Sequence, residues 1–197
     1  MLSRYSDPRS AVASAPAPYL GGPTFALKHR AMRLLWSLSW KVLASWTPPS
    51  FQPLRRHLLQ LFGADIHSTA MVRSSARIWW PANLSMGAHA SLGPHATCYN
   101  VAMITMDDFV IVSQRAHLCS ATHDVDDPEF PLTSRPITIG RKAWVAAEAF
   151  VGPGVTIGEG AVLGARGVAV RDLDAWMIYA GNPARPLRAR TKAGGGS

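Results

Sequence analysis

An aliphatic residue returns at every sixth position over residues 137–170, and this feature constrains the fold of the chain more than any other. The repeated positions are Ile139, Val145, Val151, Ile157 and Leu163, followed by the smaller Ala169. A period of six matches neither the 3.6-residue period of an α-helix nor the two-residue period of a single strand. The spacing therefore predicts a small structural unit, a short strand followed by a turn, that is repeated many times.

Small residues accompany the aliphatic ones, as with Ala143 two positions before Val145 and Ala149 two positions before Val151. Residues two apart in a strand face the same side, so both members of each pair should point inward. Several of the aliphatic residues are followed directly by a glycine, namely Gly140, Gly152, Gly158 and Gly164. We expect these glycines to form the corners, where a positive φ is needed. Because one unit cannot bury its own apolar face, the units must stack as a solenoid. A β-sandwich with regular turns is the alternative, and five units in unbroken register argue against it.

The same period runs through the preceding part of the chain, with shifts of register. It includes Ile66, Val72, Ile78 and Leu84, then Met86 and Leu92, then Met106, Val112 and Leu118. Leu118 and Ile139 are 21 positions apart, which is three more than three units of six require. The intervening stretch contains three prolines, which regular strands exclude. We therefore predict an extruded loop over about residues 120–136.

The chain divides into four segments by composition. Residues 1–23 are rich in Ala, Pro, Ser and Gly and are expected to be disordered. Residues 24–62 show helical spacing, with a stop at Pro48 and a second short helix near residues 54–62. Residues 63–182 contain the repeats, and residues 183–197 form a basic C-terminal tail. The apolar stripe of the first helix consists of Leu27, Ala31, Leu34, Leu38, Val42 and Trp46, with Lys28, Arg30, Arg33 and Lys41 between them.

Charge and cysteine content limit the partners and the compartment. The net charge is +8 and the calculated pI about 10.2, which favours polyanions such as nucleic acid, acidic lipid or a phosphate-rich cofactor. Two cysteines do not make a disulfide framework, so a reducing compartment is favoured. The sequence has neither a long apolar run nor a signal-peptide pattern. We therefore expect a cytoplasmic protein.

One segment carries a more specific signal: "CSATHDVDDPEFPLTSRPITIGRKAWVAAEAFVGPGVTIGEGAVLGARGVAV", followed by "AGNPARPLR". It resembles the hexapeptide-repeat acetyltransferases, and within them the galactoside and maltose branch and the colanic acid biosynthesis acetyltransferases. The resemblance spans about residues 63–188. It implies a mainly β protein, a left-handed parallel β-helix with an N-terminal helical segment. It also implies acetyl-CoA as co-substrate, no metal, a sugar or polysaccharide-precursor acceptor, and a homotrimer with active sites between subunits.

The resemblance assigns the catalytic role to His123, at the start of the extruded loop. Histidine suits this role because its ordinary pKa allows it to accept a proton near neutral pH. The family pattern places Asn100 beside the acceptor, where an amide can bind a hydroxyl without taking its proton. Asp124 or Asp126 could fix the tautomer of His123 and contact the substrate. The alternatives are an exposed loop histidine, a coil-corner asparagine and solvated carboxylates.

The co-substrate site is also carried over from the family. Trp144 faces out of the coil beside the acetyl-CoA groove, and Ala147 and Ala165 present backbone groups to the pantetheine arm. Arg171 and Arg188 match the basic positions that contact its phosphates, with Arg185 nearby, and guanidinium groups suit phosphate. Ordinary turn packing and a solvated basic tail are the alternatives.

Two departures from the family pattern bear on that co-substrate site. Val170 replaces a hydroxyl residue, which removes one contact with the phosphates or the adenine. Arg166 replaces a small residue beside the groove, where it could add a phosphate contact or crowd the arm.

The sequence thus predicts direct O-acetyl transfer from acetyl-CoA to a sugar hydroxyl in exopolysaccharide biosynthesis, without a covalent acyl-enzyme. One alternative is a γ-type carbonic anhydrase, since His89 and His95 are six apart, as are His117 and His123. Zinc needs three converging ligands, and the loop fits acyl transfer better.

Another alternative is a catalytically silent scaffold or an adaptor at the inner face of the membrane. A basic amphipathic helix can lie on anionic lipid, although capping of the open solenoid end is favoured. Nucleic acid is not expected as a partner, because it would explain the charge but not the repeats.

Overall fold

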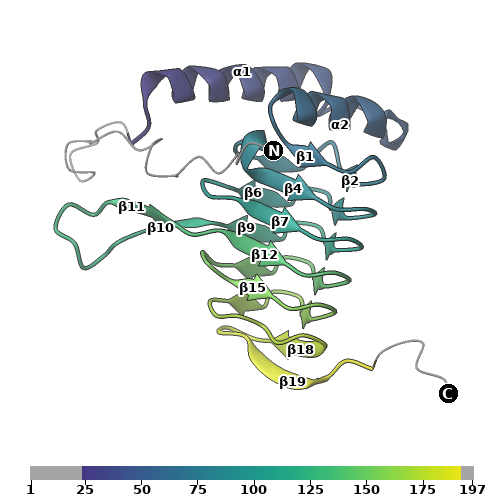
Figure 1. The fold of residues 1–197 in the computed structure, drawn as a ribbon, viewed down its shortest axis with the longest axis vertical. Helices are drawn as coiled ribbons and strands as arrows, with labels where there is room; N and C mark the ends of the chain where they lie inside the picture. The colour runs from purple at the N-terminus through teal and green to yellow at the C-terminus, as the bar shows by residue number, and fades with distance from the viewer. Residues whose placement is uncertain (1–23, 192–197) are drawn as a thin grey trace, which may run out of the picture.

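The computed structural model describes residues 24–191 and has the shape of a three-sided column capped by two helices (Figure 1). Short strands make up its three faces, and they run parallel to one another except for the last strand of the second face. The first face contains β1 (Asp65–Ile66), β4 (Leu84–Met86), β7 (Ile104–Met106), β12 (Ile137–Ile139) and β15 (Thr156–Ile157). The second face contains β2 (Met71–Val72), β5 (Ser91–Leu92), β8 (Ile111–Val112), β13 (Trp144–Val145), β16 (Val162–Leu163), β18 (Met177–Ala180) and β19 (Arg185–Ala189). The third face contains β3 (Arg77–Ile78), β6 (Thr97–Tyr99), β9 (His117–Cys119), β14 (Phe150–Val151) and β17 (Val168–Ala169).

The coils stack in register, so that aliphatic residues lie directly above one another. Val145 pairs with Val112 in one neighbouring coil and with Leu163 in the other. All three side chains are buried, as are the small partners Ala143 and Ala161. The predicted left-handed parallel β-helix is therefore confirmed, and its core is the column of residues that the six-residue period marked.

The corners are built differently from our expectation. The left-handed residue lies three positions after the inward aliphatic residue, as at Lys142 (φ 59°) and Glu148 (φ 59°), and not one position after it. Among the described glycines, positive φ occurs at Gly63, Gly154, Gly160 and Gly181. A glycine that directly follows the aliphatic residue serves close packing: a Cβ built on Gly158 would lie 2.5 Å from the Ala175 nitrogen of the next coil.

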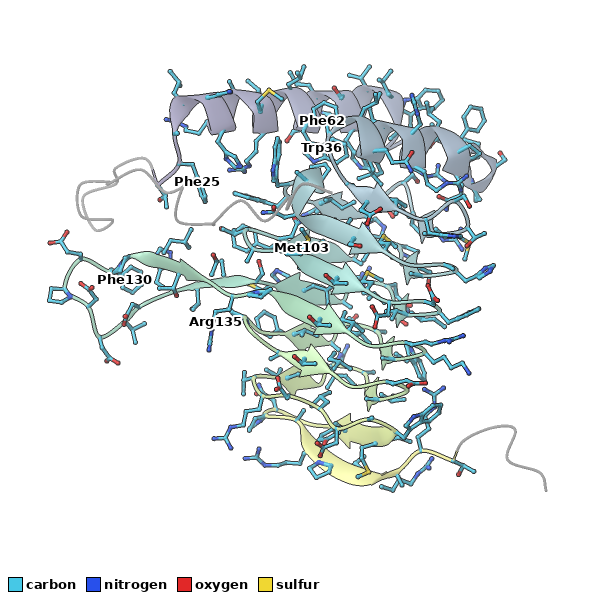
Figure 2. All side chains as sticks on the ribbon, in the orientation of Figure 1. Phe25, Trp36, Phe62, Met103, Phe130 and Arg135 are labelled. Atoms are coloured by element: carbon cyan, nitrogen blue, oxygen red, sulfur yellow. The ribbon has the colours of Figure 1, made fainter. Side chains whose placement is uncertain are left out.

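Two helices, α1 (Leu27–Leu43) and α2 (Gln52–Leu61), cover the N-terminal end of the column, with a 3-10 turn at Pro49–Phe51 between them. Trp36 and Trp40 of α1 are buried against the first coils, and the Trp36 indole donates a 2.8 Å hydrogen bond to the Ile78 carbonyl. Figure 2 shows Trp36 and Phe62 between the helices and the coils. The helices thus cap the solenoid. The stripe of α1 that we identified as apolar does not face the coils, because Leu34 and Leu38 are more than half exposed.

The extruded segment is a β-hairpin rather than an irregular loop. Strands β10 (Ala121–His123) and β11 (Leu132–Ser134) pair antiparallel and project from the corner between the third and first faces (Figure 1). Arg135 N donates a 2.9 Å hydrogen bond to the Ser120 carbonyl, which closes the base of the hairpin. The column therefore continues below the hairpin without a change of register.

The sequence analysis expected a basic tail from residue 183. In the structure, most of the described part of this segment, residues 183–191, is a β-strand. Residues 185–189 form β19, which runs antiparallel to β18 and ends the second face. A chain reversal at Gly181 brings this segment back along β18, so it adds a strand instead of leaving the column. The predictions for residues 1–23 and for the end of the tail, 192–197, lie outside the described residues. Within residues 24–191 no helix combines the length and the apolar character that a membrane span needs.

Candidate active site

His123 lies in the hairpin with its ring fixed on both sides. Its Nδ1 is 2.9 Å from the Phe130 carbonyl oxygen, and its ring stacks on the Phe130 ring with centroids 4.4 Å apart. A carbonyl oxygen only accepts hydrogen bonds, so this contact assigns the proton of the neutral ring to Nδ1. The lone pair is then on Nε2. Phe130 supplies both contacts, and the sequence analysis did not identify it. The only sequence signal for this role was an aromatic residue in the predicted loop, seven positions after His123.

The carboxylates near His123 are directed elsewhere. Asp124 Oδ1 accepts a 3.1 Å hydrogen bond from the Asp126 backbone N–H, and the Asp124 N–H donates to the Pro131 carbonyl. Asp124 therefore shapes the turn of the hairpin. The Phe130 carbonyl occupies the position on Nδ1 that we had considered for a carboxylate.

Asn100 is fully buried at a corner of the column. Its Oδ1 accepts a 3.0 Å hydrogen bond from Trp80 N, and its Nδ2 donates a 2.6 Å hydrogen bond to the Trp80 carbonyl. The Asn83 amide also donates to the Asn100 carbonyl. Both ends of the Asn100 amide thus hold neighbouring coils together, which is the alternative role at a coil corner that the sequence allowed. Asn100 could contact an acceptor substrate only if these hydrogen bonds broke.

The residues expected to hold the pantetheine arm lie at the corner between the second and third faces. Trp144 is 43% exposed on β13, and its indole donates a 2.8 Å hydrogen bond to Ser113 Oγ. Ala147 and Ala165 occupy the same turn position in successive coils, and the Ala147 carbonyl accepts from Arg166 N. Within residues 24–191, the Ala147 and Ala165 N–H groups donate to no backbone oxygen. Small side chains and available N–H groups leave room for a thin ligand along this corner.

Arg166 is held at the same corner by an ion pair. Its Nε is 2.7 Å from Glu148 Oε2, and Arg115 approaches the other oxygen of Glu148 at 3.6 Å. The Arg166 guanidinium, and to a smaller extent Arg115, lowers the pKa of the Glu148 carboxyl. This contact directs Arg166 along the corner toward the neighbouring coil, so its charge is already partly neutralised.

The predicted phosphate-binding arginines are separated in the structure. Arg171 lines a small cleft of about 140 Å³ together with Arg185, Pro183 and Val170. Arg188 lies elsewhere, exposed on β19, where its Nη1 donates to the Ala189 carbonyl. The structure therefore places Arg171 and Arg185 on the same cleft, whereas the sequence had placed Arg185 only near the expected phosphate contacts.

The histidine pairs six apart do not converge. His89 lies at the first–second corner, stacked on Phe109 with centroids 5.1 Å apart, whereas His95 lies one corner further along. His117 is on the third face, packed edge-on against Phe150 at 5.4 Å, and His123 is on the hairpin. Within the described part of the chain, no three His, Cys, Asp or Glu side chains group as metal ligands would.

Neither cysteine is placed as a nucleophile. Cys98 is fully buried in the column, and burial raises the pKa of its thiol far above the usual range, so it remains protonated. Cys119 Sγ lies 3.2 Å from the Ala121 carbonyl, to which a thiol can donate. The histidine of the hairpin is therefore the better candidate for the reacting group.

His123 and the co-substrate residues lie at different corners of the same column. The hairpin leaves the third–first corner, whereas Ala147 and Ala165 lie at the second–third corner. The cleft around Arg171 is at the same corner as the hairpin but two coils further along. One chain thus places His123 and the residues expected to hold the pantetheine arm on separate edges of the column.

Comparison with known proteins gives a consistent set of relatives, although no protein-family model matches the chain. The chain is 36% identical to an Escherichia coli (strain K12) protein named as a colanic acid biosynthesis acetyltransferase, over 91% of this chain and 95% of the relative. A maltose O-acetyltransferase structure from Clostridium difficile 630 aligns with a TM-score of 0.75, at 20% identity, over 85% of this chain and 90% of that one. A hexapeptide-repeat acetyltransferase from Vibrio cholerae, solved with acetyl coenzyme A, aligns with a TM-score of 0.72, at 22% identity, over 85% and 91%.

Proposed function

The chain belongs to the hexapeptide-repeat acetyltransferases, and on this premise we propose that it moves an acetyl group from acetyl-CoA to a sugar hydroxyl during exopolysaccharide synthesis. The observation that carries the proposal is the hydrogen bond from His123 Nδ1 to the Phe130 carbonyl. That bond leaves Nε2 with its lone pair, which is the form that a general base needs.

In the proposed reaction both substrates are bound at once. His123 Nε2 accepts the proton of the acceptor hydroxyl as the hydroxyl oxygen attacks the thioester carbonyl carbon. The tetrahedral oxyanion is stabilised by a backbone N–H. The intermediate then expels the CoA sulfur, which takes up the proton from the imidazolium, so the products are the O-acetyl sugar and free CoA thiol. The Phe130 carbonyl accepts from Nδ1 throughout and so holds the ring in place while Nε2 gains and then loses the proton.

We also propose that the active unit is a homotrimer with its sites between subunits. The separation of His123 from Ala147 and Ala165 on one column supports this arrangement. A complementation experiment tests it: His123→Ala chains and Ala165→Trp chains should each be inactive alone, and mixed trimers should recover activity. Recovery is expected because some sites then combine an intact hairpin with an intact groove. Failure of mixed trimers to recover any activity, or a monomer in light scattering, would contradict shared sites.

Calorimetric titration with CoA and acetyl-CoA is the direct test of the co-substrate. We expect a dissociation constant in the micromolar range, weakened by Arg171→Ala and Arg185→Ala, which remove the two guanidinium groups of one cleft. Arg188→Ala tests the carried-over position on β19. Arg141→Ala changes an exposed arginine at another corner; it is the matched control and should bind as the wild type does.

His123→Ala in the same titration should bind CoA normally and fail in turnover. A folded trimer that binds no CoA would favour the silent scaffold instead and would point to Val170 and Arg166 as the cause.

A further inference from the structure

The outer side of α1 presents an apolar surface to solvent. This surface takes no part in packing α1 against the coils, which Trp36 and Trp40 provide. The exposed fractions are 77% for Leu27, 61% for Leu34, 51% for Leu38 and 63% for Val42 of α1, and 70% for Trp46 in the turn that follows the helix. These residues recur at helical spacing and lie on the side opposite the buried Trp36 and Trp40. Exposed apolar residues continue beyond the helix at Phe51 and at Leu61 of α2. A soluble monomer rarely leaves a continuous apolar surface of this kind without a partner.

The same cap is strongly and uniformly basic. Residues 24–64 contain six Lys or Arg residues and no Asp or Glu, and the first carboxylate after them is Asp65. Lys28, Arg30 and Lys41 of α1 are exposed. Arg55 is buried and Arg33 is half-buried, so they belong to the interior of the cap rather than to its surface.

Three polar side chains of α1 and of the turn that follows it donate to backbone carbonyls of the helix. The Trp46 indole donates a 2.7 Å hydrogen bond to the Val42 carbonyl although its ring is exposed. Ser37 and Ser45 donate to the Arg33 and Lys41 carbonyls, at 2.9 Å each. These groups would carry no unpaired donor into an apolar medium, where each would be costly.

We propose that the outer side of α1 docks on a bilayer surface that contains anionic lipid. The leucines, Val42 and Trp46 enter the boundary between headgroups and acyl chains, and the three exposed cations of α1 contact anionic headgroups. A second copy of the same cap is disfavoured as the occupant, because it would bring two acid-free basic surfaces together. Since α1 lies across the end of the column (Figure 1), the solenoid axis would stand away from the membrane.

This orientation places the hairpin near the membrane but not in it. Strand order along the first face is β1, β4, β7 and β12, and the hairpin precedes β12. At about 4.8 Å between neighbouring strands, the hairpin lies about 14 Å beyond the first coil. The reaction site and the docking surface are therefore separate, and each can be altered without the other.

Vesicle flotation of the full chain tests the proposal. We expect the protein to float with vesicles of phosphatidylcholine containing about a third phosphatidylglycerol, and not with pure phosphatidylcholine. Leu34→Glu and Leu38→Glu should each weaken partitioning about ten-fold, because each removes one leucine side chain from the lipid boundary. Leu187→Glu on β19 is the matched control: this leucine is 65% exposed at the opposite end of the column, and its replacement should change nothing.

A second variant removes charge instead of apolar surface. Arg30→Glu with Lys41→Glu should also release the protein from anionic vesicles, as should 1 M salt, at which the screening length falls to about 3 Å. Circular dichroism checks that each variant is folded. The proposal is overturned if the wild type does not float, or if the leucine and charge variants float as the wild type does. It is also overturned if the leucine variants change the oligomeric state and leave vesicle binding unaltered, since the occupant would then be a second copy.

Discussion

The cap and the hairpin are both additions to the same repeating column, and they are held in opposite ways. The cap is anchored by side chains: Trp36 is 2% exposed and Arg55 is 1% exposed. The hairpin is held by its own backbone pairing, with register Thr122–Thr133 and His123–Leu132, while residues such as Val125 remain exposed. Figure 2 shows Phe130 out on the hairpin and Arg135 at its base, beside the column.

The difference indicates a division between stability and chemistry. A segment that buries large side chains contributes to the free energy of folding, so changes there are costly. A hairpin that is closed at its base by the bond from Arg135 N to the Ser120 carbonyl can vary without disturbing the coils around it. We therefore expect variants of the hairpin to affect turnover and variants of the cap to affect stability.

The largest effect should come from His123→Ala in the hairpin. Loss of a general base lowers kcat by about 10²- to 10⁴-fold, whereas the melting temperature should stay within the scatter of replicate wild-type scans. His89→Ala, which changes an exposed histidine at another corner, is the control and should retain full turnover. Near-normal kcat for His123→Ala would remove its assignment as the base.

The corresponding variant of the cap is Arg55→Met. It should lower the stability of the protein, whereas His123→Ala should lower kcat and leave stability unchanged. Arg55 donates five hydrogen bonds, to the Val72, Thr47, Pro48 and Pro49 carbonyls and to Thr47 Oγ1. Methionine fills most of the volume but leaves buried carbonyl groups unpaired, so the free energy of unfolding should fall by about 2–4 kcal/mol.

Chemical denaturation at fixed protein concentration measures this change. Arg56→Met, at the next and more exposed position, should change the free energy of unfolding by less than about 0.5 kcal/mol. Equal losses for the two variants would show that the cap is not anchored through Arg55.

The same division explains what the sequence could predict. Strict repetition places every inward residue, so the buried column and the position of the hairpin followed from spacing alone. The corner could not be read in this way: Gly158 is small because Ala175 of the next coil lies against it, and the left-handed residue is Gly160. A contact between coils is not visible in the pattern of one coil.

Features outside the repeat were predicted less well, because they depend on contacts specific to this chain. The leucine stripe of α1 has clear helical spacing, but spacing alone does not determine which side of the helix packs on the coils. In the structure the indoles of Trp36 and Trp40 pack on the coils, and the leucines face solvent. For the candidate site, resemblance identified His123 but not Phe130, whose backbone carbonyl makes the deciding contact. A role played by a backbone atom leaves little trace in the sequence.

A smaller effect is expected for Phe130→Ala, which separates two roles within the hairpin. The variant keeps the backbone carbonyl that binds His123 Nδ1 and removes the ring stacked 4.4 Å from the imidazole. Because a stacked pair contributes about 0.5–1.5 kcal/mol, kcat should fall by about two- to thirteen-fold.

The kcat of Phe130→Leu should lie between those of the wild type and Phe130→Ala. The wild type and the two variants should have the same melting temperature. A loss as large as that of His123→Ala would mean that the ring, and not the carbonyl, positions the base.

The smallest effect we expect is a pH dependence that belongs to the cap. Burial, and to a smaller extent the charge of Arg33, lowers the pKa of His29 below its ordinary value of 6.5. The unfolded chain therefore binds a proton at a higher pH than the folded chain does, so the stability from neutral His29 is present above pH 6.5 and is lost as the pH falls below it. Burial also lowers the pKa of His117 on the third face, which adds to the same trend.

Melting curves between pH 8 and pH 5 measure this loss, and His29→Leu should flatten the acidic part of the profile. Arg33→Met keeps the burial of His29 and removes the neighbouring charge, so its profile should lie between those of the wild type and His29→Leu. The residual slope of His29→Leu should decrease further when His117→Leu is added, since burial also lowers the pKa of His117. If His29→Leu keeps the full wild-type slope, the acid sensitivity lies in the column and the cap is no more sensitive to pH than the hairpin is.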